Sequence, residues 1–317
     1  MEAETSIPSR ERVEFQSGGE TCVAWHYPSR IGVLIVMASG LAVTRSAGTD
    51  AYAEAFVEAG FGVLAFDFRH FGDSAGSPRQ VAGINNMRCD LAAAINFARS
   101  LPDVDDDGIA LWGFSLSGGL VIEAAAKTPG LFAVIAQSPL VDGRAAARHT
   151  MQHQTITAAV RLGMRAIADA LGARVGRAPR MAELVGARGS VALLTTPDAG
   201  DAERALGPRH LHPEWREEVA ARIVLALPSY RPGTLGSSVT CPLLIVASVE
   251  DGTVPIQSAR VVVERAPAGE SVEITGGHYA PFLEGFNECV SAEIAFLRKH
   301  ALPDTNPAGR AGRTVRS

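Results

Sequence analysis

The sequence predicts an α/β fold in which helices cover both faces of a mostly parallel central sheet. Two observations carry this prediction: short runs of consecutive apolar residues recur along the chain, and longer helical stretches separate them. Strands that are buried on both faces are apolar at successive positions. Their alternation with helices predicts right-handed β-α-β units. The expected buried strands are Gly32–Met37, Gly62–Phe66, Ile109–Trp112, Phe132–Ala136 and Leu243–Ala247.

The remaining elements of the predicted sheet domain follow in order. Two segments, Val13–Gln16 and Thr21–Tyr27, flank a Ser-Gly-Gly turn and predict an antiparallel hairpin at one edge. A further short strand is expected at Val272–Thr275. The expected helices are Thr49–Ala59, Ile84–Ser100, Leu116–Lys127, Ile256–Arg265 and Phe282–His300.

The strand–helix alternation stops over residues 142–238. This stretch lacks a strong buried strand and holds helical runs near Ala145–Leu171 and Pro213–Leu227, with Gly/Pro-rich breaks between them. A long insertion between sheet strands commonly forms a lid. We therefore expect a core built from residues 1–141 and 239–302, a helical cap at 142–238, and a disordered tail at 303–317.

Composition excludes several classes of protein. The chain has 317 residues, 47% hydrophobic and 20% charged, with a formal net charge of −5. This balance is typical of a packed globular domain and excludes a disordered or coiled-coil chain. Mild acidity argues against a nucleic-acid-binding protein, which needs a clustered basic face.

Cysteine use and hydropathy predict a cytoplasmic protein with no membrane partner. The four cysteines, Cys22, Cys89, Cys241 and Cys289, are widely spaced and include no C-x-x-C pair, which favours reduced thiols over disulfides or a zinc site. The first twelve residues are polar and charged, unlike a signal peptide. The longest apolar run, Ile31–Ala38, is far shorter than the ~20 residues of a membrane helix.

A candidate nucleophile lies between an expected strand and an expected helix. Gly113, Ser115 and Ser117 stand at the spacing G-x-S-x-S, close to the G-x-S-x-G turn that presents a nucleophilic serine above a sheet. The residues two before and two after the serine must be small because the turn is sharp, and both are. The Leu116 N–H lies at a helix N-terminus, where it can stabilise an oxyanion. An ordinary glycine-rich turn is the alternative, and the spacing matches no phosphate loop.

Two later loops supply the expected partners of Ser115. Asp251 follows the strand Leu243–Ala247, and His278 follows the strand Val272–Thr275 in a glycine-bounded loop. The chain order Ser, Asp, His is the order of this class of triad. A lone loop Asp or His is usually solvated surface, but three such residues, each after its own strand, favour a shared site.

These motifs resemble the α/β-hydrolase fold with a cap. The sequence is most similar to bacterial serine hydrolases of the dienelactone-hydrolase-like and thioesterase-like type, which include enzymes of polyketide metabolism. The resemblance covers about residues 12–300 and rests on Asp67–Ser74, Leu111–Gly119, the Asp251 loop and Gly277–His278. It implies Ser115 as nucleophile, His278 as general base and Asp251 as the acid that orients it. It also implies an oxyanion hole formed by the main-chain N–H groups of Leu41 and Leu116.

The sequence departs from this family after its third strand. The family usually has His-Gly there, whereas this chain has Ser39, Gly40 and Leu41. The donor is a main-chain group, so it survives the change, while the loop loses the histidine that usually supports it.

Other polar residues have alternative interpretations. Asp142 and Glu250 are alternative acids. We interpret Asp67 and Arg69 as structural, and His70 as a wall or loop residue. His149 and His153 stand four apart, but without a glutamate or a third ligand they are better read as cap surface or pocket lining. The acidic run Asp103–Asp107 lacks the twelfth-position Glu of a calcium loop, so it is interpreted as a solvated loop.

The function predicted from these residues is hydrolysis of an ester, thioester or lactone through an acyl-enzyme. No metal or organic cofactor is required. The Ala/Val/Leu-rich cap favours a small apolar or acyl substrate. Two alternatives stay open: the same triad could transfer the acyl group to an alcohol or amine, or close a ring, and the scaffold could be a non-catalytic binding protein. The sequence does not indicate an oligomeric state.

Overall fold

The computed structural model describes residues 9–207 and 211–301, and its central sheet has eight strands in the order β1-β2-β4-β3-β5-β6-β10-β11. β1 pairs antiparallel with β2, and β2 with β4, whereas all other neighbours are parallel. The predicted α/β sheet is thereby confirmed. Its strands are β1 (Glu11–Ser17), β2 (Glu20–Tyr27), β3 (Leu34–Ala38), β4 (Gly62–Phe66), β5 (Ile109–Phe114), β6 (Ala133–Gln137), β10 (Leu243–Ser248) and β11 (Gly269–Ile274).

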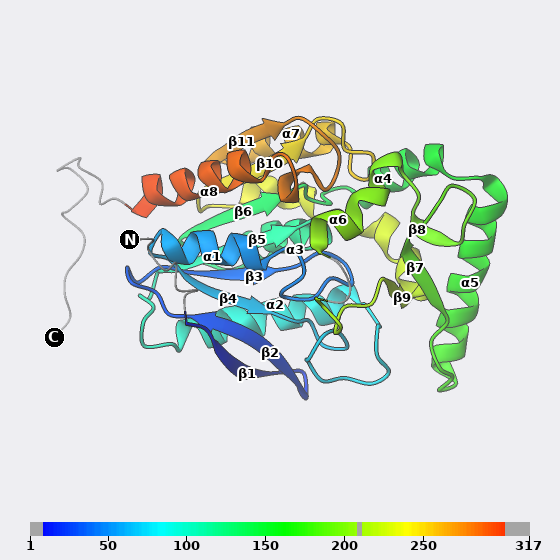
Figure 1. Ribbon diagram of the computed structural model, residues 1–317, viewed down its shortest axis with the longest axis horizontal. Helices are drawn as coiled ribbons and strands as arrows, with labels where there is room; N and C mark the ends of the chain where they lie inside the picture. The colour runs from blue at the N-terminus through cyan, green and yellow to red at the C-terminus, as the bar shows by residue number, and fades with distance from the viewer. Residues whose placement is uncertain (1–8, 208–210, 302–317) are drawn as a thin grey trace, which may run out of the picture.

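Helices cover both faces of this sheet (Figure 1). On one face lie α1 (Asp50–Glu58) and α8 (Phe286–Ala301). On the other lie α2 (Ile84–Arg99), α3 (Leu116–Ala125) and α7 (Ile256–Arg265). All five helices expected for the core are present. The expected start of the last one at Phe282 is early, because a 3-10 turn, η6 (Ala280–Phe282), precedes it.

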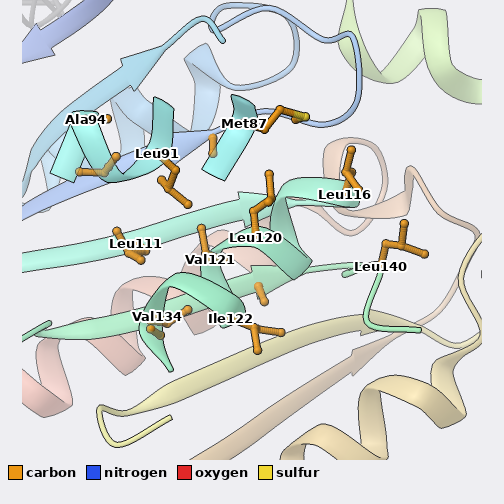
Figure 2. Close-up of a cluster of buried hydrophobic side chains, with 14 of the residues drawn as sticks. Met87, Leu91, Ala94, Leu111, Leu116, Leu120, Val121, Ile122, Val134 and Leu140 are labelled. Carbon is orange, nitrogen blue, oxygen red and sulfur yellow. The ribbon is translucent and has the colours of Figure 1, made fainter. Parts of the chain in front are cut away.

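Each buried strand contributes to two hydrophobic cores because its side chains alternate between faces. In β3, Leu34 and Val36 pack on the side of α2 and α3, while Ile35 and Met37 pack on the side of α1 and α8. Consecutive apolar residues are therefore required. Figure 2 shows part of the first core, in which side chains of α2 and α3 lie beside those of β5 and β6.

The segment between β6 and β10, called the cap below (residues 142–238), extends beyond one end of the sheet (Figure 1). The single expected helical run at Ala145–Leu171 is divided into two helices. Helix was also expected over Pro213–Leu227, where the structure has a strand and 3-10 turns. The cap contains α4 (Gly143–Thr150), η1 (Met151–His153), α5 (Ile156–Arg174), β7 (Met181–Val185), β8 (Ala192–Leu194), η2 (Pro197–Asp201), α6 (Ala202–Leu206), β9 (Glu218–Ala220), η3 (Ala221–Leu225), η4 (Leu227–Ser229) and η5 (Pro232–Ser238).

The cap also holds a second sheet, in the order β8-β7-β9, which the sequence did not predict. β7 pairs parallel with β8 and antiparallel with β9. Its residues alternate between buried and exposed, and its two partners are three residues long. Such strands lack the run of consecutive apolar residues that marks a buried central strand.

Three further expectations concern thiols, membrane spans and the tail. All four cysteines are free thiols. Across residues 9–207 and 211–301, no helix combines the length and the apolarity needed to cross a bilayer. The tail expected at 303–317 lies outside the described residues.

A buried carboxyl group lies beneath the strand that leads to the candidate nucleophile. Glu293 of α8 is fully buried, and its Oε2 accepts a hydrogen bond from Trp112 Nε1 of β5 at 3.1 Å. Burial raises the pKa of Glu293 well above its usual range, against a smaller lowering by Trp112. The folded protein therefore holds this group in its neutral form at pH values where an unfolded chain has lost the proton.

We expect this proton to make stability depend on pH. Between the ordinary Glu pKa and the raised one, the folded state binds more protons than the unfolded state, so the free energy of unfolding falls as pH rises, by up to ~1.4 kcal/mol per pH unit. Glu293→Gln should remove this slope while keeping an acceptor for Trp112. Urea denaturation at a series of pH values measures it. Glu288→Gln, an exposed change on the same helix, should leave the wild-type slope. An unchanged slope in Glu293→Gln would contradict the assignment.

Candidate active site

Ser115 occupies a strained turn between β5 and α3. Its φ of 56° and ψ of −117° lie in a region that non-glycine residues rarely adopt. Main-chain hydrogen bonds hold it there: Ser115 N–H donates to the Gln137 carbonyl at 2.9 Å, and the Ser115 carbonyl accepts from Leu140 N–H at 2.8 Å. A Cβ at Gly113 would lie 2.4 Å from the Ser117 carbonyl oxygen, so the turn requires glycine at 113.

Three of the predicted site residues form one hydrogen-bonded chain. His278 Nε2 lies 2.9 Å from Ser115 Oγ, and His278 Nδ1 lies 2.8 Å from Asp251 Oδ2. His278 and Asp251 are buried, while Ser115 is partly exposed to the cavity beside it. With Nδ1–H donating to the Asp251 carboxylate, Nε2 is free to accept the Ser115 hydroxyl proton. This is the arrangement of a serine nucleophile with its base and orienting acid.

Sheet topology explains why these residues meet. Each of them follows the carboxyl end of a strand: Ser115 follows β5, Asp251 follows β10 and His278 follows β11. These strands are parallel, and β6 separates β5 from β10. Parallel strands end at the same edge of a sheet, which is where α/β folds place their sites.

The acid and the base are fixed by contacts of their own. Asp251 Oδ1 accepts hydrogen bonds from the N–H groups of Thr253 and Val254, at 2.8 and 2.7 Å. The His278 ring packs against Phe114 and Tyr279, with ring centroids 5.0 and 5.2 Å away. These contacts and the Asp251 hydrogen bond favour the ring orientation that points Nε2 at Ser115.

The two predicted oxyanion donors border the same cavity as Ser115. Leu116 is the first residue of α3, so its N–H has no acceptor within the helix. Leu41 lies in the loop after β3, and both residues line the cavity with Ser115. Both residues thus border the cavity that Ser115 faces, and the role of their N–H groups as oxyanion donors stays a prediction.

The two departures from the family pattern contact each other. Ser117, which stands where the motif usually has glycine, is fully buried, and its Oγ donates to the Ser39 carbonyl at 2.5 Å. Ser39 lies in the loop that carries Leu41, and its own Oγ donates to the Thr44 carbonyl at 3.0 Å. Ser117 therefore links the nucleophile turn to the Leu41 loop. The sequence showed only that residue 117 is small, since a side-chain bond to a distant carbonyl leaves no pattern.

We expect Ser117→Ala to lower kcat about 3- to 30-fold with little change in KM. The variant leaves the buried Ser39 carbonyl without its donor, a cost of ~1–3 kcal/mol, and so displaces Leu41. An oxyanion donor is worth ~2.7–4 kcal/mol, and a displaced donor loses part of that. Steady-state kinetics on an activated ester measures the effect. Ser74→Ala, which loses two buried bonds, one to the Asp67 carbonyl and one from the Val23 N–H, should lower stability and spare kcat. Equal kcat in wild type and Ser117→Ala would refute the link.

An apolar cavity of about 240 Å³ opens beside Ser115 between the sheet and the cap. Its core side is formed by Leu41, Phe114 and Leu140, and most of the remaining wall comes from the cap. Small residues of α4 and α5 make room for a ligand. They are Gly143, Ala146, Ala147, Ala159 and Gly163.

The alternative acids have other roles. Asp142 caps α4 by accepting from the N–H groups of Arg144 and Ala145, and it pairs with Arg231. Burial raises the pKa of Asp142, but these hydrogen bonds and the Arg231 charge together bring it below its usual value. Glu250 is exposed, and the His278 ring forms its hydrogen bond with Asp251, the residue after Glu250.

The residues interpreted as structural hold one loop. Asp67 accepts hydrogen bonds from the Arg45 main chain and side chain, and Arg69 pairs with buried Asp90. His70 is a loop residue with φ of 72°, and it does not line the apolar cavity. The expectation of a structural loop is confirmed, with partners other than each other.

The two cap histidines, His149 and His153, lie near Asp251. His149 Nε2 is 3.2 Å from the Asp251 carbonyl oxygen, and His149 and His153 line a second hollow of about 750 Å³ with Glu250. The expectation of pocket lining is confirmed. Among residues 9–207 and 211–301, no three His, Cys, Asp or Glu side chains are grouped as metal ligands.

Comparisons with known proteins agree with the fold and with an α/β-hydrolase. The family model "Serine aminopeptidase, S33" matches residues 31–186. The quorum-quenching protein AidA of Acinetobacter baumannii (strain MDR-ZJ06) is 36% identical over 292 residues, which cover 90% of this chain and 94% of AidA. The polyketide transferase grgF of a Penicillium species is 33% identical over 135 residues, 42% of this chain and 46% of that protein.

Solved structures share the fold. The α/β hydrolase GrgF from Penicillium sp. sh18 has a TM-score of 0.77 at 22% identity, covering 92% of this chain and 99% of that one. DcsB, solved with a substrate analogue, has a TM-score of 0.76 at 24% identity over similar shares. From its sheet order, its strained serine turn and its likeness to AidA over nearly the whole length of both chains, this protein belongs to the α/β-hydrolase superfamily and is an enzyme of that superfamily.

Proposed function

We propose that the protein is a serine hydrolase that cleaves an ester, thioester or lactone of a small molecule with an apolar acyl group. The observation that carries this proposal is the chain Ser115–His278–Asp251, whose hydroxyl end opens into an apolar cavity. The nucleophile provides the covalent chemistry, and the cavity provides an environment for hydrocarbon. The proposed partner is a small-molecule substrate, with no nucleic acid or membrane involved. The four free thiols support a reducing, cytoplasmic compartment.

The mechanism proceeds in two acyl-transfer steps. His278 takes the Ser115 proton as Oγ attacks the substrate carbonyl, and the oxyanion accepts hydrogen bonds from the N–H groups of Leu41 and Leu116. The intermediate collapses, His278 protonates the leaving alcohol or thiol, and an acyl-Ser115 ester remains. Water, deprotonated by His278, then attacks that ester, and the imidazolium returns the proton to Ser115 Oγ as the acid is released. Asp251 stabilises the imidazolium formed in both steps. All of these steps use protein groups: three side chains of the triad and two main-chain N–H groups.

A substrate panel with active-site labelling tests the proposal. We expect turnover of acyl esters, acyl thioesters or acyl lactones, with butyrate and octanoate chains preferred over palmitate because the cavity is smaller than the ~300–1,000 Å³ of a typical drug-sized ligand site. A fluorophosphonate probe should modify the wild-type protein once, at Ser115, as shown by intact and peptide mass spectrometry. A protein that is neither labelled nor active on any member of the panel would contradict the proposal.

A second candidate function is transfer of the acyl group to an alcohol or amine. Similarity to a protein named a polyketide transferase favours it, and the apolar walls beside Ser115 restrict water. Ring closure by a hydroxyl of the acyl chain itself uses the same chemistry. Product analysis with a competing alcohol present separates these outcomes: an ester product identifies transfer, and free acid alone identifies hydrolysis.

A further inference from the structure

One carboxylate of the cap contacts the loops of both the base and the acid. Asp198 lies in η2, between β8 and α6. Its Oδ2 accepts a hydrogen bond from the main-chain N–H of His278 at 2.8 Å and another from the main-chain N–H of Gly252 at 2.9 Å. One oxygen of the cap thus bridges the residue that acts as base and the residue next to the acid.

The Asp198 side chain packs closely against two glycines of the core. A Cβ at Gly277 would lie 2.5 Å from Asp198 Cβ, and a Cβ at Gly252 would lie 2.6 Å from Asp198 Oδ1. Any other residue at either position would push the carboxylate away. The glycines beside His278 and Asp251 are therefore explained by the close fit of Asp198.

The charge of Asp198 also acts on the base. Burial alone would raise the pKa of Asp198, but its hydrogen bonds, including those from the His278 and Gly252 N–H groups, bring the pKa below the usual value. The group is thus a carboxylate near an imidazole that becomes positive during catalysis. The other groups around His278 are Asp251 at Nδ1, Ser115 at Nε2 and the Tyr279 hydroxyl-bearing ring, while His149 contacts the Asp251 carbonyl.

We propose that Asp198 is a positioning residue that holds the His278 loop and the Asp251 loop in register, so that docking of the cap and alignment of the triad are coupled. This inference rests on the proposed function. Asp198 does not line the apolar cavity, so it acts on the triad without touching the substrate. Its loss should therefore appear in kcat with little effect on KM, because misplacement of a catalytic group by about 1 Å can cost ~100-fold in rate.

The test compares Asp198→Ala, Asp198→Asn and Asp201→Asn in steady-state kinetics across pH. Asp201 lies in the same 3-10 turn and pairs with Arg204 outside the triad, so its variant is the matched control and should resemble wild type. We expect Asp198→Ala to lower kcat about 10- to 100-fold at similar KM. Asp198→Asn retains an acceptor oxygen and should restore much of kcat. In both Asp198 variants the acid limb of the kcat/KM profile should move to lower pH, because a negative charge near the imidazolium is gone.

Each outcome decides the inference. Three results would overturn it. They are a kcat of Asp198→Ala within twofold of wild type, a loss of kcat/KM that comes from a higher KM, and an acid limb that does not move. If Asp198→Ala does not fold, Asp198→Asn carries the test through the pH profile alone, and an unmoved limb there is again a refutation. An inactive wild-type protein, or an active Ser115→Ala, refutes the proposed function instead. Active wild type, inactive Ser115→Ala and normal Asp198 variants refute only this inference.

Discussion

Replacement of Ser115 by alanine is expected to reduce kcat on an acyl ester by ~10⁴- to 10⁶-fold. Loss of a catalytic serine removes the covalent step, and a comparable knock-out in another serine hydrolase costs about 2 × 10⁶ in kcat. The apolar cavity and the Leu41 and Leu116 donors remain in this variant, so KM should change little. Single-turnover and steady-state assays measure the loss, and fluorophosphonate labelling should disappear with it.

Ser248→Ala is the matched control for this experiment. Ser248 stands at the carboxyl end of β10, at the same edge of the sheet, and its buried Oγ has no partner among the described residues. Removing this hydroxyl should leave kcat within about twofold, because no hydrogen bond is lost. Residual activity of Ser115→Ala above a tenth of wild type would assign the chemistry to another group.

Much of the core fold could be predicted because burial on both faces leaves a local signal. β4 coincides with the expected Gly62–Phe66, and α7 with the expected Ile256–Arg265. In each case the apolar pattern of the element's own residues indicates which of its faces are buried. The cap sheet could not be predicted in this way. β8 and β9 are three residues long and are stabilised by pairing with β7, a tertiary contact that their own residues do not encode as a pattern.

The site residues likewise differ in whether a local sequence pattern marks them. Ser115, Asp251 and His278 could be named from the sequence because each follows a recognisable strand in a known chain order, and the structure brings them into one hydrogen-bonded chain. Ser117 and Asp198 could not be given roles. Each contacts main-chain groups of a segment far away in the chain, and any residue type at that segment offers such a group. The sequence did hold one indication of the Asp198 contact. Residues 252 and 277 are glycines because Asp198 approaches both positions closely.

Replacement of Asp251 by asparagine is expected to lower kcat ~10⁴-fold at nearly constant KM. The amide oxygen can keep the bonds from Thr253 and Val254, which turns the amide NH₂ toward His278. Nδ1 must then accept, so the proton moves to Nε2, and the ring can no longer take the Ser115 proton. A tautomer error of this kind costs about 10⁴ in a related triad.

The alternative acids serve as controls for Asp251→Asn in the same pre-steady-state and steady-state assays. Glu250→Gln changes an exposed neighbour, and Asp142→Asn keeps an acceptor for the N–H groups at the start of α4. Both should retain kcat within a few-fold, since neither carboxylate bonds to the imidazole. A loss in Asp142→Asn or Glu250→Gln that exceeds the loss in Asp251→Asn would move the acid to that residue. Because the tautomer of His278 is set by the group in contact with Nδ1, only replacement of the carboxylate 2.8 Å from that atom should show the large effect.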